Sequence, residues 1–189
     1  MNEEFEKIDK NTTWELVPRP KAKNIIGTKW VFKNKLDEEG KVVRNKARIV
    51  CKGYAQVEGI DFDETFATVT RLNVIRIFLA FACYKKIKVY QMDVKLDFLN
   101  GELEEEVYIE QHEGFLSGDD EDLVCRLKKT LYCLKQAPRS WYTKVNKHLQ
   151  QQVFKNGYMD NNLYVKFEDD HFLIIVVYVD DISLGAIWR

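Results

Sequence analysis

The sequence predicts an α+β fold with a mainly antiparallel sheet, as three observations indicate. Apolar residues recur at helical spacing over 71–85 and again in the segment that begins at Pro138. Alternating or continuous apolar runs, which are typical of strands, occupy 28–35, 41–54, 163–167 and 172–179. Turn residues separate these segments, so helices and strands alternate along the chain.

Composition limits the class of protein. The 189 residues suffice for one domain with a core or for two small lobes that share one. A hydrophobic fraction of 46% with 13% aromatic residues predicts a globular chain. The formal net charge of −1 argues against binding nucleic acid by bulk charge alone, so a nucleic-acid-binding role requires a local basic strip.

Cysteine spacing and hydropathy indicate the compartment. The four cysteines form no C-x-x-C pair and the three histidines are scattered, which argues against a zinc site and favours reduced thiols. Met1 leads directly into charged residues, unlike a signal peptide. The longest apolar run, 172–179, is far shorter than the about 20 residues of a membrane helix. We expect an intracellular, cytoplasmic protein that is neither secreted nor bound to a membrane.

The first half of the chain contains the patterns of two helices and one hairpin. Phe5 and Ile8 give residues 1–10 an amphipathic helical pattern, and Pro18 and Pro20 mark an extended segment. The strands over 28–35 and 41–54 are joined by the turn Asp-Glu-Glu-Gly. A helix follows over 71–85.

The second half continues with a strand over 86–94, which Asn100-Gly101 ends. The acidic run 102–106 predicts a solvated turn. Pro138 fits the first turn of a helix. Further predicted elements are a short strand over 107–111, a polar loop over 118–122, the helix carrying Trp141, Val145 and Leu149 at intervals of four, and strands over 163–167 and 172–179.

Carboxylates at two strand ends are the main candidates for chemistry. Asp180 and Asp181 follow a continuous apolar run, and Asp93 ends the strand over 86–94. If the two strands are neighbours, three carboxylates converge at one edge of the sheet, where they could hold two Mg²⁺ ions. The alternative for each position is an ordinary aspartate in a turn.

A cationic strip and a helix entry supply further candidates. Lys46, Arg48 and Lys52 share one face of the predicted return strand, as a triphosphate site would need, although a solvated face of a hairpin explains each one alone. Gln136 stands at the entry of the helix after Pro138, where a polar side chain can read a nucleotide and the helix N-terminus favours phosphate. That pattern is weak by itself.

Several segments, in order and with their spacing, resemble the reverse transcriptase of copia-type retrotransposons. They cover the chain from the first helix to about residue 182. The segments are TWELVPRP (13–20), GTKWVFKNK (27–35), KARIVCKGYAQVEGIDFDETFA (46–67), QMDVK with FLNGELEEEVYIEQHEGF (91–115), LKKTLYCLKQAPRSWY (127–142) and YVDD (178–181).

The resemblance implies a right-hand polymerase, with about 11–85 mostly fingers and about 86–189 mostly palm with insertions of the fingers. It implies RNA-directed DNA synthesis from dNTPs on a primed RNA or DNA template. By motif, Asp93, Asp180 and Asp181 bind two Mg²⁺ ions, with Mn²⁺ as the alternative. Gln136 contacts the nucleotide, and Phe98 excludes a ribose 2′-hydroxyl. It further implies a Pol polyprotein with gag, protease, integrase and ribonuclease H, in a virus-like particle.

The sequence departs from the family pattern at four places. Asp97 replaces a small residue beside the expected triphosphate, where it would repel phosphate or compete for Mg²⁺. Cys133 stands where the family has glycine, and it would strain a turn with positive φ. Thr68 replaces a proline, a mild change. Finally, the segment 182–189 drifts from the pattern, and we expect a truncated domain without a thumb.

Two functional hypotheses follow from these observations. The chain is an active nucleotidyltransferase, or it is an inactive relic that keeps the fold; Asp97 and the expected lack of a thumb favour the second. An unrelated Mg²⁺ phosphodiesterase would use the same carboxylates, but it leaves the other matching segments unexplained.

Overall fold

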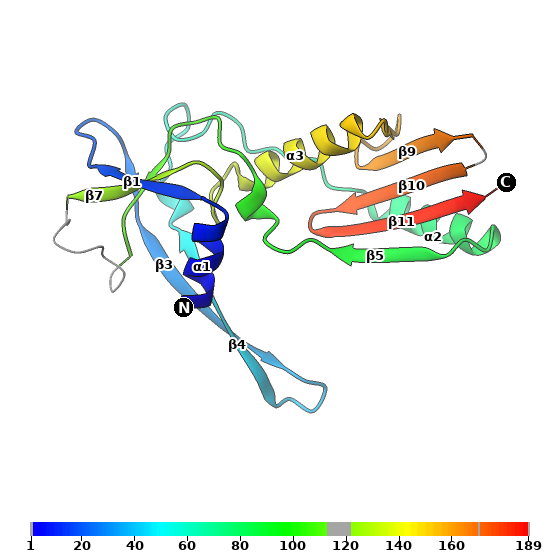
Figure 1. The fold of residues 1–189 in the computed structure, drawn as a ribbon, viewed down its shortest axis with the longest axis horizontal. Coiled ribbons are helices and arrows are strands. Elements are labelled where there is room, and N and C mark those ends of the chain that lie inside the picture. Colours follow the sequence, from blue (N-terminus) through cyan, green and yellow to red (C-terminus); the bar gives the residue numbers. More distant parts are fainter. Residues whose placement is uncertain (1, 113–121, 170, 189) are drawn as a thin grey trace. The chain divides into compact units, whose positions relative to one another are not determined.

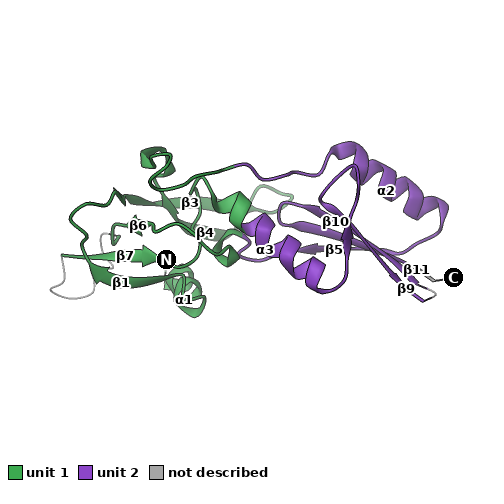
Figure 2. Cartoon of the chain, turned by 90° about the horizontal axis from the view of Figure 1, so that it is seen from above, with its two compact units in different colours: residues 1–65, 98–140 green, residues 66–97, 141–189 purple. Residues whose placement is uncertain are grey.

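The computed structural model describes residues 2–112, 122–169 and 171–188, and of Ile187 and Trp188 only the backbone (Figure 1). The chain forms two compact units (Figure 2). Unit 1 contains Met1–Thr65 and Phe98–Ser140, and unit 2 contains Phe66–Asp97 and Trp141–Arg189. Neither unit is continuous in sequence. The helix predicted over 71–85 belongs to unit 2, and the expected division into fingers (about 11–85) and palm (about 86–189) stays a prediction.

Unit 1 has a four-stranded sheet in the order β1-β7-β6-β2. Strand β1 (Trp14–Pro18) pairs antiparallel with β7 (Leu123–Leu127), and β2 (Ile25–Ile26) pairs parallel with β6 (Tyr108–Ile109). The sequence predicted an extended segment near Pro18 and a short strand over 107–111. It did not predict β7, and the loop expected over 118–122 lies, apart from Asp122, outside the described residues.

The predicted hairpin is present in unit 1. Strand β3 (Thr28–Leu36) pairs antiparallel with β4 (Val42–Cys51), and a short 3₁₀ helix, η1 (Gly53–Ala55), follows. The predicted amphipathic helix is α1 (Asn2–Lys10), whose Ile8 is buried. The ring of Phe5 lies 5.9 Å from that of Trp14 and 5.6 Å from that of Trp30, so α1 is fixed to β1 and β3 by aromatic contacts.

Unit 2 has a five-stranded antiparallel sheet in the order β5-β11-β10-β9-β8. Its elements agree with the predicted helices over 71–85 and after Pro138 and with the strands over 86–94, 163–167 and 172–179. They are α2 (Leu72–Tyr84), β5 (Val89–Asp93), most of α3 (Ala137–Gln151), β8 (Lys155–Asn156), β9 (Leu163–Glu168), β10 (His171–Tyr178) and β11 (Asp181–Trp188).

Strand β11 corrects one expectation. The segment after Asp181 was expected to drift from the family pattern, but it forms the second strand of a hairpin with β10, in register from Tyr178↔Asp181 to His171↔Trp188. The alternation of Ile182, Leu184 and Ala186 with smaller or polar residues gives it a strand pattern. The strand that completes the pairing of the apolar run is therefore present.

The two faces of this sheet contact different helices. Phe78 of α2 packs with Ile174 and Val176 on one face, and Gly185 lies directly beneath its ring. A Cβ at position 185 would be 3.2 Å from that ring, so glycine lets the helix approach. On the other face, the hydroxyl of Tyr164 donates a hydrogen bond to Asn146 Oδ1 of α3 (3.1 Å).

Within the described part of the chain, none of the helices combines the length and the apolar character needed to span a bilayer.

Candidate functional site

Two of the three candidate carboxylates lie opposite each other in unit 2. Strand β5 pairs antiparallel with β11, and Asp93 is the direct register partner of Asp181. Cross-strand partners project from the same face of a sheet with their Cβ atoms roughly 5 Å apart. The side chain of Gln91, two residues before Asp93, donates a hydrogen bond from Nε2 to Asp181 Oδ1 (3.1 Å). The two strand ends thus meet as the sequence predicted.

The third carboxylate belongs to a strained turn. Val179 and Asp180 form the two-residue connection between β10 and β11, and Val179 has φ +56°. A β-branched residue rarely adopts positive φ, and it costs about 1–3 kcal/mol there. The turn is held on both sides: Trp141 Nε1 donates to Val179 O (2.8 Å), and Val94 N donates to Asp180 O (2.8 Å).

Among the described residues, no three aspartate, glutamate, histidine or cysteine side chains gather closely enough to hold a metal ion. Asp93 and Asp181 provide carboxylate oxygens on adjacent strands, the donor type that a hard divalent cation prefers. Asp180 does not complete a cluster with them. The donor set therefore suits such an ion in chemistry, and its use as a metal site stays a prediction.

Unit 1 contains the predicted cationic strip, and the strip is longer than expected. In the β3–β4 register Lys33 lies opposite Lys46, and Lys35 lies opposite Arg44. Burial, together with the positive charges of Arg48 and Lys35, holds the pKa of Lys46 below its usual value. One face of the hairpin carries Lys29, Lys33, Lys35, Arg44, Lys46 and Arg48.

Lys52 differs from the other two predicted cations of the strip. Strand β4 ends at Cys51, so Lys52 lies beyond the alternating pattern on which the prediction rested. Its backbone N–H donates to Gly27 O (2.8 Å). Its side chain passes over Gly27, where a Cβ would be 3.1 Å from Lys52 Cδ.

Tyr132 connects two predicted nucleotide-binding residues of unit 1. The guanidinium carbon of Arg48 lies 5.3 Å from the centre of the Tyr132 ring, within cation–π range. The same ring meets that of Phe98 edge to face, with centroids 6.2 Å apart. Sequence reasoning missed Tyr132. Its position four residues before Gln136, in the same motif, was the available signal.

Gln136 occupies a different environment from the one expected of a nucleotide contact. Its side chain is 1% exposed. Its Nε2 donates to Asp61 O (2.8 Å), and its Oε1 accepts from Gln56 Nε2 (2.9 Å). Both amide atoms therefore act inside unit 1, and a contact with a nucleotide stays a prediction.

Two of the residues that depart from the family pattern, Cys133 and Asp97, lie in unusual surroundings. Cys133 has φ +70°, so the strain expected from replacing a glycine is present. Asp97 is only 8% exposed, at the end of the first segment of unit 2, and the preceding Leu96 has φ +62°. Whether Asp97 repels a phosphate stays a prediction.

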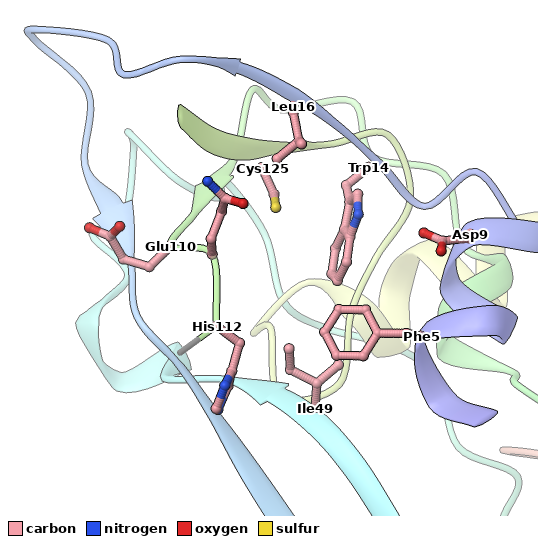
Figure 3. Close-up of a pocket in the computed structure, with 9 residues that line it drawn as sticks. Phe5, Asp9, Trp14, Leu16, Ile49, Glu110, His112 and Cys125 are labelled. Carbon is pink, nitrogen blue, oxygen red and sulfur yellow. The ribbon is translucent and has the colours of Figure 1, made fainter. Parts of the chain in front are cut away.

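A cavity of about 280 Å³ in unit 1 lies between α1, β1, β4 and β7 (Figure 3). Burial raises the pKa of the Cys125 thiol to about 12, so this thiol stays protonated near neutral pH. None of the predicted catalytic or nucleotide-binding residues lines the cavity. Its lining residues are Phe5, Asp9, Trp14, Leu16, Ile49, Glu110, Gln111, His112 and Cys125.

The family model for reverse transcriptase (RNA-dependent DNA polymerase) matches residues 11–187. The chain belongs to the reverse transcriptase family. It is 47% identical over 185 residues, 97% of its length, to the retrovirus-related Pol polyprotein from transposon TNT 1-94 of Nicotiana tabacum. It is 42% and 41% identical over 175 residues to the corresponding polyproteins from transposons RE2 and RE1 of Arabidopsis thaliana. The predicted resemblance to copia-type reverse transcriptases is confirmed.

This reverse transcriptase domain spans 14% of the tobacco polyprotein and 12% of each Arabidopsis polyprotein. A shorter relative, the uncharacterized mitochondrial protein AtMg00820 of Arabidopsis thaliana, is 51% identical over 79 residues, 42% of this chain and 46% of that protein. Similarity thus extends both to long polyproteins and to a short protein that matches less than half of the domain.

Proposed function

We propose that the chain is the polymerase domain of a copia-type Pol polyprotein and adds dNTPs to a primer on an RNA or DNA template. The register pairing of Asp93 with Asp181, beside the Tyr-Val-Asp-Asp hairpin, carries this proposal. Unit 2 serves as the palm, and unit 1 contributes most of the fingers.

In unit 2, Asp93, Asp180 and Asp181 would bind two Mg²⁺ ions, with Mn²⁺ as the alternative. Such ions activate a primer 3′-hydroxyl and neutralise the charge of a leaving pyrophosphate. The hydrogen bonds from Trp141 Nε1 and Val94 N hold the backbone of the turn. These bonds fix the backbone of the turn, so the Asp180 side chain is the part that would move toward Asp93 and Asp181 when cations bind.

In unit 1, the cationic face of the hairpin suits the phosphates of a nucleotide and of a template strand. This face has six cations, which is more than one triphosphate needs. Like charges that lie opposite each other destabilise a hairpin unless an anion binds. Arg48 would bind the triphosphate together with Lys46 or Lys52. Phe98, whose ring Tyr132 supports, would exclude a 2′-hydroxyl.

As part of a polyprotein, the domain would act with gag, integrase and ribonuclease H. Its location would then be intracellular, within a virus-like particle. The family resemblance implies these partners, and the relatives are named as Pol polyproteins.

Primer extension tests the proposal. We expect the full chain with Mg²⁺ to extend an oligo(dT) primer on poly(rA), and we expect the Asp180→Asn variant, which removes one carboxylate, to lose this activity. Extension by both proteins would indicate a contaminating polymerase. If Asp97 impairs nucleotide binding, the Asp97→Ala variant extends further than the natural chain.

A second candidate is a folded domain without polymerase activity. Two observations favour it: the three carboxylates do not form a cluster in the described residues, and Cys133 is strained. The absence of extension by the natural chain and by Asp97→Ala, both shown to be folded, would establish it.

A further inference from the structure

Unit 1 contains a buried pair of side-chain amides. Gln56 is 5% exposed and Gln136 is 1% exposed, and their amides are joined by a hydrogen bond of 2.9 Å. The two residues are 80 positions apart in the sequence. An amide buried without partners is costly, so a pair of this kind persists only when both members are satisfied.

The hydrogen bonds of the pair run in one direction. Lys135 N donates to Gln56 Oε1 (2.8 Å), and Gln56 Nε2 donates to Gln136 Oε1. Gln136 Nε2 then donates to Asp61 O (2.8 Å). Because the chain of bonds starts at a backbone N–H and ends at a backbone carbonyl, neither amide can be flipped without placing two donors or two acceptors together.

This pair joins the segment after η1 to the turn that carries Tyr132. The turn is also held at its other end, since Cys51 N donates to Tyr132 O (2.9 Å). The ammonium of Lys135 lies 4.6 Å from the centre of the Phe62 ring, which adds a further contact between the two segments. Gln56 thus contributes to the position of the backbone from Tyr132 to Gln136.

We propose that Gln56 is a positioning residue for the nucleotide pocket, acting through Lys135 N and Gln136 on the turn that holds Tyr132 beside Arg48 and Phe98. The inference rests on the proposed polymerase function and deepens it. Gln56 itself is buried and touches no nucleotide. Its loss displaces the turn and weakens nucleotide binding, while the carboxylates of unit 2 and their chemistry are left unchanged.

Two variants separate the two hydrogen bonds of Gln56. Gln56→Leu removes both, and Gln56→Glu keeps an acceptor for Lys135 N but loses the donor to Gln136. Asn156→Leu is the matched control, because Asn156 of unit 2 also forms an amide network, with Asn146, Gln150 and Asn161 O. Thermal unfolding measures the loss of stability that each of the three substitutions causes, so that this loss can be compared among the variants.

The experiment measures binding of radiolabelled dTTP to the full chain with a dideoxy-terminated oligo(dT) primer on poly(rA), and KM and kcat with an extendable primer. We expect both Gln56 variants to raise Kd and KM for dTTP about tenfold with kcat nearly unchanged. Asn156→Leu should bind dTTP like the natural chain at a similar loss of thermal stability.

Unchanged dTTP binding by both Gln56 variants would overturn the inference and leave the proposed function standing. Equal weakening in Asn156→Leu would also overturn it, since general destabilisation would explain the effect. If the natural chain binds dTTP but extends no primer, the proposed function fails. In that case the dTTP affinities of the variants, compared with that of the natural chain, still decide the inference. If the natural chain binds no dTTP, both fail. Should Gln56→Leu not fold, Gln56→Glu decides alone.

Discussion

Among the described residues other than glycine that have positive backbone φ, Cys133 and Val179 have direct consequences for stability. Cys133 and Val179 lie in two turns, one in each unit. A left-handed conformation costs a residue with a Cβ about 1–2 kcal/mol. At Val179 this strain belongs to the turn with Asp180, where the proposed function needs a fixed backbone. At Cys133 nothing in the structure requires a side chain larger than glycine.

Cys133→Gly should therefore raise the free energy of unfolding, by about 0.5–1 kcal/mol after the higher chain entropy of glycine is subtracted. Urea unfolding of the full chain measures this change. The matched substitution Cys83→Gly, within α2, should lower stability by about 1 kcal/mol because it introduces glycine into a helix. A loss of stability in Cys133→Gly would contradict the assignment of strain.

Gly53 faces the same turn at very close range. A Cβ at position 53 would lie 2.0 Å from the carbonyl oxygen of Cys133, a distance that no side chain can adopt. Gly53→Ala should cost about 3 kcal/mol, because the backbone must move. Gly27→Ala is the control, since its Cβ would meet only the flexible side chain of Lys52. Equal unfolding midpoints in urea for the two variants would refute the close contact.

Individual residues show which parts of the site could be predicted from the sequence and which could not. Asp93 was expected to meet Asp180, with Asp181 beside it, because these residues follow strand ends and periodicity identifies strand ends. The register pairs Asp93 with Asp181 instead. Gln136 was expected at a nucleotide because it begins a helix, but burial depends on Gln56, a distant residue that periodicity cannot pair with it. Tyr132 was missed for the same reason: its contacts with Arg48 and Phe98 come from segments far apart in sequence.

At the scale of elements, the β3–β4 hairpin combines a function in binding with a cost in stability. Lys33 and Lys46 are directly opposite each other, and like charges in this arrangement destabilise a strand pair. Lys33→Glu should replace repulsion by attraction and raise the free energy of unfolding by about 0.5–1 kcal/mol at low salt. The same change should weaken binding of a primed template.

Thermal unfolding at low and high salt checks this prediction, because salt screens the pair and should reduce the gain. Lys29→Glu is the control on the same strand and the same face, since its cross-strand partner is the uncharged Val50. It should weaken template binding without the gain in stability. Equal stabilisation by both variants would assign the effect to net charge instead of to the cross-strand pair.

The predicted elements divide according to the range of their contacts. The hairpin, α2, α3 and the β9–β10 pair were predicted because their patterns and turns are local in the sequence. Strand β7 was missed because it is five residues long and pairs with β1 across more than a hundred residues. Strand β11 was missed because a glycine interrupts its pattern, and that glycine makes room for Phe78.

At the scale of the whole molecule, both units are built from interleaved segments. The chain passes from one unit to the other after residues 65, 97 and 140. A fragment 1–140 contains all of unit 1, whereas 1–97 contains only the first segment of each unit. We expect the backbone amides of β1 to be protected from hydrogen exchange in 1–140 and unprotected in 1–97, because β7 is absent from the shorter fragment.

The full chain supplies the reference rates for this exchange measurement. Protection of β1 in the 1–97 fragment would mean that the strand has a partner other than β7.

The pairing of β1 with β7 has a consequence for synthesis on the ribosome. Trp14–Pro18 emerges more than a hundred residues before Leu123–Leu127, its partner. At about 5–20 residues per second, the strand waits roughly 5–20 seconds with its backbone hydrogen-bonding groups unpaired. During that interval a nascent chain exposes an open strand edge to chaperones and to neighbouring chains. Conditions that slow translation between residues 18 and 123 should therefore increase aggregation of this domain, even though the finished fold is unchanged.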